Sequence, residues 1–281
     1  MAENLKSMKI NHELVLPNEG LHFKVFLFEG YEGNYHRENH WHQSIEIFAV
    51  CEGQLTFQMS DRRWTLNPGQ FVIVNSNEIH GVLAPDPNKT IVLQIPLQTF
   101  ENYFTGEQFI WFSHEPGQQD ERVMELIREI YDIYTEKAYG YHFSATACFF
   151  HLMYLLVTEY RMTEVSQEFY KSSKKLNKLS EITSYMKTHH SSDMQLTDVA
   201  KTFGYSPTYL SRMFKKYAGV NFKNYLQSVR IEFALDELKN SRQSINAIAL
   251  EHGFPNSKAF ARAFFAKYGI LPSDYRKKAK N

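Results

Sequence analysis

The sequence has few cysteines, and neither is placed for chemistry. Cys51 and Cys148 are the two cysteines among 281 residues, and both stand among apolar neighbours. Two such residues form no spaced framework of disulfides or zinc ligands. We therefore interpret both as small core residues of a protein in a reducing compartment, and neither as a catalytic thiol.

Long apolar runs are also missing. No stretch approaches the roughly 18 consecutive apolar residues that suggest a membrane span, and the first residues lack the apolar run of a secretion signal. The most apolar segment, 143–157, includes Ser144, Thr146 and His151, which favours a buried or subunit-facing helix. We expect a cytoplasmic protein that has no contact with a membrane.

The chain has no net charge, with 31 Lys and Arg against 31 Asp and Glu. A zero total would argue against a nucleic-acid partner, but the charges are unevenly distributed. Residues 1–170 hold 11 basic and 23 acidic residues, whereas residues 171–281 hold 20 basic and 8 acidic ones. This distribution indicates that only the last third of the chain meets a polyanion. The length favours two domains over one.

Short runs of alternating apolar residues fill the region from about 21 to 96. They lie at 22–28, 44–50, 54–59, 62–66, 71–74, 79–83 and 90–95. Closely spaced short strands separated by turn residues predict an antiparallel sandwich or barrel. With the helices that follow, the predicted fold class is α+β.

Two helices are expected after this region, at 120–137 and 142–161. The first has one apolar stripe, formed by Val123, Leu126, Ile127, Ile130, Tyr131 and Tyr134. Their apolar surface exceeds what a small barrel can cover, which suggests a homodimer interface, although packing on their own barrel is an alternative. Residues 163–178 lose the apolar period and predict a linker between a first domain, 1–162, and a second, 179–281.

The second domain contains a repeat. Ala200, Gly204 and Tyr205 match Ala249, Gly253 and Phe254 at an offset of 49, and Leu210, Arg212, Phe214, Gly219 and Tyr225 match Phe260, Arg262, Phe264, Gly269 and Tyr275 at an offset of 50. In each copy a helix ends at a glycine, which suits a tight turn, and a second helix then begins. Ser206 with Pro207, and Asn256 in the other copy, are the expected helix starts.

Each copy therefore has the parts of a helix-turn-helix. The apolar pairs Leu210/Phe214 and Phe260/Phe264 anchor one face of each second helix and leave the other face exposed. The exposed residues are Thr208, Ser211, Arg212 and Lys215 in the first copy and Ser257, Lys258, Ala261 and Arg262 in the second. Arginine and lysine can read guanine edges, and small hydroxyl side chains allow close approach to DNA. Ordinary solvated helix faces are the alternative explanation.

Residues 221–241 predict a helix of about 18 residues between the two copies, or about 27 Å. That length can place two recognition helices into successive major grooves about 34 Å apart. Double-stranded DNA is therefore the expected partner of this domain.

Residues 179–278 resemble the DNA-binding domain of AraC/XylS-family transcription regulators. The segment 248–276 is similar to the family signature at Gly253, Phe254, Phe260, Arg262, Phe264, Gly269, Pro272 and Tyr275. The resemblance implies base contacts by Thr208, Ser211, Arg212, Ser257, Lys258 and Arg262, with Lys215 and Lys216 beside them; Lys216 is expected on phosphate. Ala259 and Ala261 stand where larger polar residues are frequent, so the second copy is expected to read fewer bases and to use phosphate contacts.

A cluster of histidines marks the first domain. On an alternating strand, His40, His42 and Glu46 would share one face, and His80 follows on a later strand. This set resembles the two motifs of the cupin barrel, which holds a metal with three histidines and a glutamate. The departures are Asn75 for proline, Asn77 for glycine, Ala84 for asparagine, and Gly33 one residue too far upstream.

Three interpretations of the cluster stay open. His40, His42, Glu46 and His80 could hold a divalent transition metal such as manganese, iron, nickel or zinc. Alternatively, they hydrogen-bond a small effector such as a sugar, with ring faces supplied by Trp41, Phe48 or Trp64. In the third interpretation they are histidines satisfied by backbone and water. The sensory domains of the family resemble cupins and usually lack catalysis, which favours sensing. The pair His189–His190 is expected at the surface.

We therefore expect a dimeric, sequence-specific transcription regulator that is not an enzyme. A sugar or sugar derivative is the expected effector, and the family resemblance implies activation through contact with RNA polymerase. A metal-dependent cupin enzyme, an isomerase or dioxygenase, or a metal sensor fused to a DNA-binding domain is the alternative. A constitutive DNA-binding protein with an idle barrel is a third hypothesis.

Overall fold

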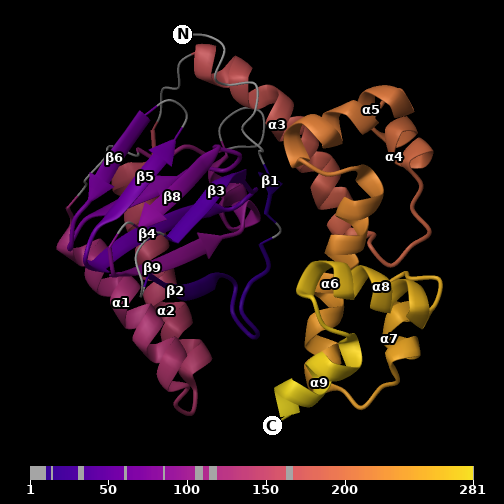
Figure 1. Ribbon diagram of the computed structural model, residues 1–281. Coiled ribbons are helices and arrows are strands. Elements are labelled where there is room, and N and C mark those ends of the chain that lie inside the picture. The colour runs from indigo at the N-terminus through magenta and orange to yellow at the C-terminus, as the bar shows by residue number, and fades with distance from the viewer. Residues whose placement is uncertain are drawn as a thin grey trace. The chain divides into compact units, whose positions relative to one another are not determined.

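The computed structural model describes residues 11–13, 15–30, 35–59, 62–84, 86–104, 110–113, 119–162 and 167–280 (Figure 1). The chain divides into two compact units, Met1–Lys175 and Leu176–Asn281. Within these described ranges, no helix combines the length and the apolar character needed to span a membrane.

Two β-sheets form the centre of the first unit. One sheet has the strand order β1 (Asn11–His12), β3 (Tyr35–Trp41), β8 (His80–Ala84), β5 (Leu55–Met59) and β6 (Arg62–Leu66), and the other has the order β2 (Lys24–Gly30), β9 (Asn88–Ile95), β4 (Ile45–Glu52) and β7 (Phe71–Val74). All pairings are antiparallel except that of β1 with β3. The predicted antiparallel fold is confirmed, and all seven predicted runs contain strands; β1 and β3 were not among them.

The strand β4 is buried on both of its faces. Phe48 and Val50 join a core with residues of both sheets, such as Phe57 of β5. Ile47 and Ala49 join a second core that includes residues of two helices. Because side chains alternate along a strand, Glu46 points to the same side as Phe48, between the two sheets. A strand covered on both faces needs a continuous apolar run, and Glu46 interrupts that run at a buried position.

The helices α1 (Glu121–Glu136) and α2 (Tyr141–Leu155) cover the four-stranded sheet. A 3-10 turn, η2 (Leu97–Tyr103), precedes them, and a π-turn, η3 (Leu156–Tyr160), continues α2. The predicted stripe of α1 is confirmed, because Val123, Leu126, Ile127 and Ile130 are buried in the core below. The inner faces of both helices thus pack on their own sheet. The outer face of α2 remains exposed at three aromatic residues, Phe143, Phe150 and Tyr154.

The second unit is helical and contains both predicted helix-turn-helix pairs. The helix α3 (Gln167–Thr188) begins in the first unit and continues into the second. The helices that follow are α4 (Leu196–Thr202), α5 (Pro207–Met213) with the π-turn η4 (Phe214–Ala218), α6 (Phe222–Asn240), α7 (Ile245–Glu251), α8 (Ser257–Tyr268) and α9 (Pro272–Lys280). The pairs are α4–α5 and α7–α8, joined by the 19 residues of α6, about 28 Å long. The predicted linker, 163–178, is helical from Gln167 onward, and its residues 163–166 lie outside the described part.

The turns of the two pairs use the chemistry expected from the sequence. The Ser206 side chain accepts a hydrogen bond from the amide of Tyr209, and Asn256 caps α8 in the same way through Ala259. Gly204 and Gly253 have φ of 71° and 80°, which favour glycine. A Cβ atom on Gly253 would lie 2.8 Å from the carbonyl oxygen of Ser191, whereas one on Gly204 would meet no atom within 4 Å.

Candidate functional site

The exposed faces of the two recognition helices carry most of the predicted DNA-contacting residues. Thr208, Ser211, Arg212, Lys215 and Lys216 are exposed on α5 and η4, and Lys258 and Arg262 are exposed on α8, where Ser257 is half-buried. In the described part of the second unit, the ion pairs join His252 to Glu237 and Lys267 to Glu232, and none uses these predicted residues. The cationic groups on both helices are thus available to a polyanion.

Four ligand-type side chains of the first unit converge at one point. His40 is the next-to-last residue of β3 and pairs with His80, the first residue of β8, while Glu46 lies on β4 and His42 precedes β4. One ligand atom from each lies within 4.8 Å of the others, and all four residues are buried. The predicted grouping of these residues in space is therefore present.

The reason given for this grouping was wrong. The prediction treated residues 40 to 46 as one alternating strand, but β3 ends at Trp41 and β4 begins at Ile45. These strands belong to different sheets, and the chain crosses between the sheets at residues 42–44. Convergence therefore results from the chain crossing between the two sheets.

Glu46 is the centre of the cluster. Its Oε2 atom lies 2.8 Å from Nε2 of His42 and 2.9 Å from Nε2 of His80. Its Oε1 atom accepts a hydrogen bond from the Gln94 amide at 2.7 Å. Burial opposes the ionisation of Glu46, but the charge and hydrogen bonds of His42 and His80 hold its pKa well below the usual range. Glu46 is therefore an ionised carboxylate in a buried position.

The outer nitrogens of the three histidines all bond to backbone. Nδ1 of His40, His42 and His80 donates to the carbonyl oxygens of Glu38, Ser44 and Glu78 at 3.1, 3.1 and 3.0 Å. A carbonyl oxygen can only accept, so each Nδ1 carries a hydrogen. These bonds fix the ring orientations and turn Nε2 of His42 and His80 toward Glu46.

Glu13 lies directly beyond the cluster, next to β1. Its Oε2 atom is 3.1 Å from Nε2 of His40 and forms an ion pair with Arg37. Burial raises the pKa of Glu13, but the hydrogen bond from His40 and nearby positive charges outweigh it and lower that pKa to about 2. Glu13 could not be predicted from the motif, because it lies about 27 residues before the motif and reaches His40 through the pairing of β1 with β3.

The three aromatic residues predicted to contact an effector, Phe48, Trp41 and Trp64, pack against different neighbours. Phe48 lies beside His80, with ring centroids 6.0 Å apart, and Phe57 stacks on the same ring at 5.9 Å. Trp41 instead meets His12 edge-on at 4.3 Å, and Trp64 packs on Phe57 at 5.4 Å. The structure therefore brings Phe48 against the histidine cluster.

Two departures from the cupin motif have structural explanations. Asn77 stands where the motif has glycine, and its φ of 65° lies in the left-handed region, which asparagine adopts more readily than most residues. Asn75 stands where the motif has proline, and its side chain exchanges two hydrogen bonds with the backbone of Phe112. The loop before β8 is therefore held by asparagine residues at positions where the motif has glycine and proline.

The expectation that His189 and His190 both lie at the surface was wrong for His190. Its ring is half-buried, stacks on Phe233 at 4.1 Å, and places Nε2 3.3 Å from Nδ1 of His252. The fold brings together the turn after α3 and the turn after α7, a contact between residues 62 positions apart that no local pattern can predict.

Both units match known domain families. Residues 22–153 match an AraC-like ligand binding domain, and residues 199–278 match a helix-turn-helix domain. Among curated proteins, an uncharacterized HTH-type transcriptional regulator of Staphylococcus aureus strain MSSA476 is 32% identical over 100 residues, which are 36% of this chain and 13% of the relative. The regulatory protein PocR of Salmonella typhimurium is 35% identical over 100 residues, 36% of this chain and 33% of that protein.

The matched region thus spans a third or less of these curated relatives. Among solved structures, ToxT from Vibrio cholerae O395 aligns with 91% of this chain and 97% of its own at a TM-score of 0.51 and 14% identity, which shows a shared fold. The two domain matches cover different parts of the chain, one in each structural unit. The chain therefore belongs to the AraC family of transcriptional regulators, with an AraC-like ligand-binding domain followed by an AraC-type helix-turn-helix domain.

Proposed function

We propose that this regulator recognises promoter DNA through α5 and α8 and responds to a small molecule bound in its first unit. One observation supports the DNA part most strongly: two capped recognition helices, joined by a helix of about 28 Å, expose cations that have no described acidic partner. Thr208, Ser211, Arg212, Ser257, Lys258 and Arg262 are the proposed base-contacting residues. Lys215 and Lys216 are proposed to contact phosphate.

The experiment that tests DNA recognition uses the full-length protein. A duplex is selected from a random pool, and its affinity is compared with that of a scrambled duplex of equal length over a range of salt concentrations. We expect tighter, salt-sensitive binding of the selected duplex. Failure to bind any duplex at low salt would remove the proposed function.

We propose the buried cluster around Glu46 as the effector site. An ionised carboxylate, three imidazoles and the Gln94 amide suit the hydroxyl groups of a sugar or sugar derivative, and Phe48 supplies an adjacent ring. A ligand bound there shifts the equilibrium between two states of the regulator only as far as its affinities for the two states differ. A thermal-shift screen of sugars tests this, because a ligand of the folded state raises the melting temperature. If a sugar raises the melting temperature of the Glu46→Gln variant as much as that of the wild type, the effector binds elsewhere.

A divalent transition metal is the second candidate ligand of this cluster. Because Nδ1 of His42 and His80 carries a hydrogen, loss of the Nε2 proton would leave a lone pair at each Nε2, and both Nε2 atoms lie 2.8 and 2.9 Å from the same carboxylate oxygen. Two acceptors at this distance repel each other unless a proton or a cation lies between them. Three nitrogens and one oxygen suit manganese, iron, nickel or zinc.

Metal analysis of protein purified without a histidine tag separates the two candidates. A stoichiometric ion that is lost in His42→Ala and retained in His189→Ala, an exposed control, supports the metal. An equal loss in both variants indicates adventitious binding. The relatives are regulators, so we propose that the protein is not an enzyme; a metal-dependent isomerase or dioxygenase becomes the alternative only if such an ion is found.

We propose that the protein forms a homodimer through α2. Phe143, Phe150 and Tyr154 are 85%, 58% and 64% exposed and follow one stripe of a helix whose opposite face is already buried. Activation through RNA polymerase, at genes of carbohydrate uptake or breakdown, is the proposed outcome. Because promoter DNA is the proposed partner, we expect the protein in the compartment that holds the chromosome.

A further inference from the structure

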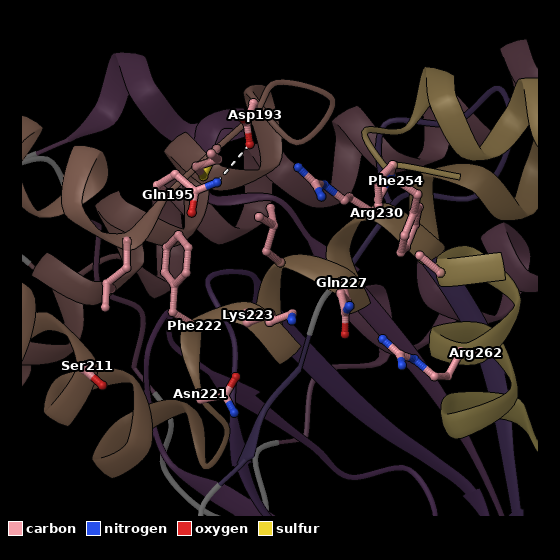
Figure 2. Close-up of a pocket in the computed structure, with 15 residues that line it drawn as sticks. Asp193, Gln195, Ser211, Asn221, Phe222, Lys223, Gln227, Arg230, Phe254 and Arg262 are labelled. Carbon is pink, nitrogen blue, oxygen red and sulfur yellow. Dashed lines mark hydrogen bonds between the residues drawn. The ribbon is translucent and has the colours of Figure 1, made fainter. Parts of the chain in front are cut away.

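A groove lies between the two helix-turn-helix pairs of the second unit. Its volume is about 580 Å³, and its lining comes from α5, α6, α8 and the segments next to them. Ser211 of α5 stands at one side and Arg262 of α8 at the other, while α6 forms the floor (Figure 2). Both flanking residues belong to the proposed DNA-contacting set, so the groove lies between the two recognition surfaces.

The middle of the groove is polar and cationic. Figure 2 shows the side chains of Lys223, Gln227 and Arg262 reaching toward its centre. Lys223 and Arg262 are exposed, and the described ion pairs of this unit include neither of them. Asp193 is the one acidic residue in the lining, and it accepts a hydrogen bond from Gln195 at the groove edge. Arg230 also reaches the lining, but it is bonded to the carbonyl oxygens of His190 and Ser192.

Lys223 occupies a position that is unfavourable for a cation. It is the second residue of α6, in a first turn that contains no acidic residue. The N-terminal end of a helix carries partial positive charge, so a lysine there is electrostatically disfavoured. A residue that breaks a local preference in this way is often retained for function.

Resting on the proposed function, we infer that this groove receives the sugar–phosphate backbone of DNA where the duplex passes from one recognition helix to the other. Two helices in successive major grooves are separated by one minor groove, and phosphates border it. Lys223 contacts a phosphate at the floor, Gln227 donates a hydrogen bond beside it, and Arg262 adds a second charge from the side. Lys223 is thus a DNA-contacting residue outside both recognition helices, and α6 is a binding element as well as a spacer.

The test compares Lys223→Ala with Lys239→Ala in the full-length protein, on the selected and the scrambled duplex. Lys239 lies on the same helix, 16 residues later and about 160° around it, with its ammonium over the Tyr275 ring. We expect Lys223→Ala to weaken both duplexes by a similar factor, about three- to tenfold, and to reduce the slope of log affinity against log salt by about one. Lys223→Arg should keep the wild-type slope, and Lys239→Ala should change neither quantity.

Each other outcome has a defined meaning. Unchanged affinity and slope in Lys223→Ala, with circular dichroism confirming the fold, overturns the inference and leaves the proposed function standing. A loss confined to the selected duplex makes Lys223 a base reader and also overturns it. Equal losses in Lys223→Ala and Lys239→Ala indicate a general charge effect, which overturns it as well. If the wild-type protein binds no duplex, the proposed function fails and the inference fails with it.

Discussion

At the scale of single residues, His190 was expected at the surface but packs against Phe233 and His252. Its imidazole contacts His252, which follows α7 and pairs with Glu237, and its own carbonyl oxygen accepts from Arg230 of α6. Burial, with the nearby His252 and Arg230, lowers the pKa of His190 from its usual 6.5. A histidine with a lowered pKa in the folded state favours folding above about pH 6.5, and this contribution is lost as the pH falls.

We therefore expect the second unit to lose stability as the pH falls below about 6.5, and His190→Gln to reduce this dependence. Urea unfolding between pH 5 and 8, followed by circular dichroism, measures the effect. All three tryptophans, Trp41, Trp64 and Trp111, lie in the first unit, so their fluorescence is an internal control that the substitution should not alter. An identical pH dependence in both proteins would contradict the role assigned to His190.

Arg212 and Lys216 are predicted to differ in what they contact. Arg212→Ala should cost about 1–3 kcal/mol on the selected duplex and relax discrimination at one position, because arginine reads a guanine edge with two hydrogen bonds. Lys216→Ala should weaken the selected and scrambled duplexes alike. Binding titrations on both duplexes measure the difference. Equal losses on both duplexes for Arg212→Ala would show that it does not read bases.

At the scale of elements, the two helix-turn-helix pairs share a plan but differ in how tightly their turns are packed. Gly204 and Gly253 occupy the same turn position with similar φ. Only Gly253 lies against other backbone, at the carbonyl oxygens of His190 and Ser191. The sequence repeat predicts a glycine at both turn positions. It does not predict that neighbouring backbone atoms also exclude a larger residue at Gly253.

This difference gives a matched pair of substitutions. Gly204→Ala should destabilise the protein by about 1–2 kcal/mol, the cost of a left-handed conformation for alanine. Gly253→Ala should cost more, because its methyl group would also overlap two backbone oxygens and force the turn to shift. Urea unfolding monitored by circular dichroism measures both. If both variants lower the free energy of unfolding equally, the close contacts around Gly253 do not add to the cost of the substitution.

At the scale of the whole molecule, α2 leaves three aromatic side chains uncovered in the single chain, at Phe143, Phe150 and Tyr154. If it is the dimer interface, Phe150→Glu should raise the dimer dissociation constant at least about tenfold, because burying an unpaired carboxylate is strongly unfavourable. Thr65→Glu, on the exposed strand β6, adds the same charge elsewhere and should have no effect. Analytical ultracentrifugation measures both. A wild-type protein that is monomeric at high concentration would exclude this interface.

Local sequence signals were sufficient to predict several elements of this protein. Alternation, helical stripes, capping residues and turn glycines predicted seven of the strands, α1, both helix-turn-helix pairs and the long helix α6, because each depends on neighbours a few residues away. The duplicated motif and the uneven charge then identified the DNA-binding domain. The start of α3 at Gln167 was not predicted, because residues 163–178 lack a regular spacing of apolar residues. Such a segment has no clear packed face, but it can still be helical.

Contacts between residues far apart in the chain could be identified only in the folded protein. Glu46 joins His42 and His80 because β4 and β8 lie in different sheets packed on one core, and Glu13 reaches His40 through a strand pairing with little signal of its own. The contact between His190 and His252, and the groove that assembles Lys223 with Arg262, likewise depend on how helices pack. Such contacts form between segments far apart in the chain, so the pattern of neighbouring residues in the sequence does not predict them.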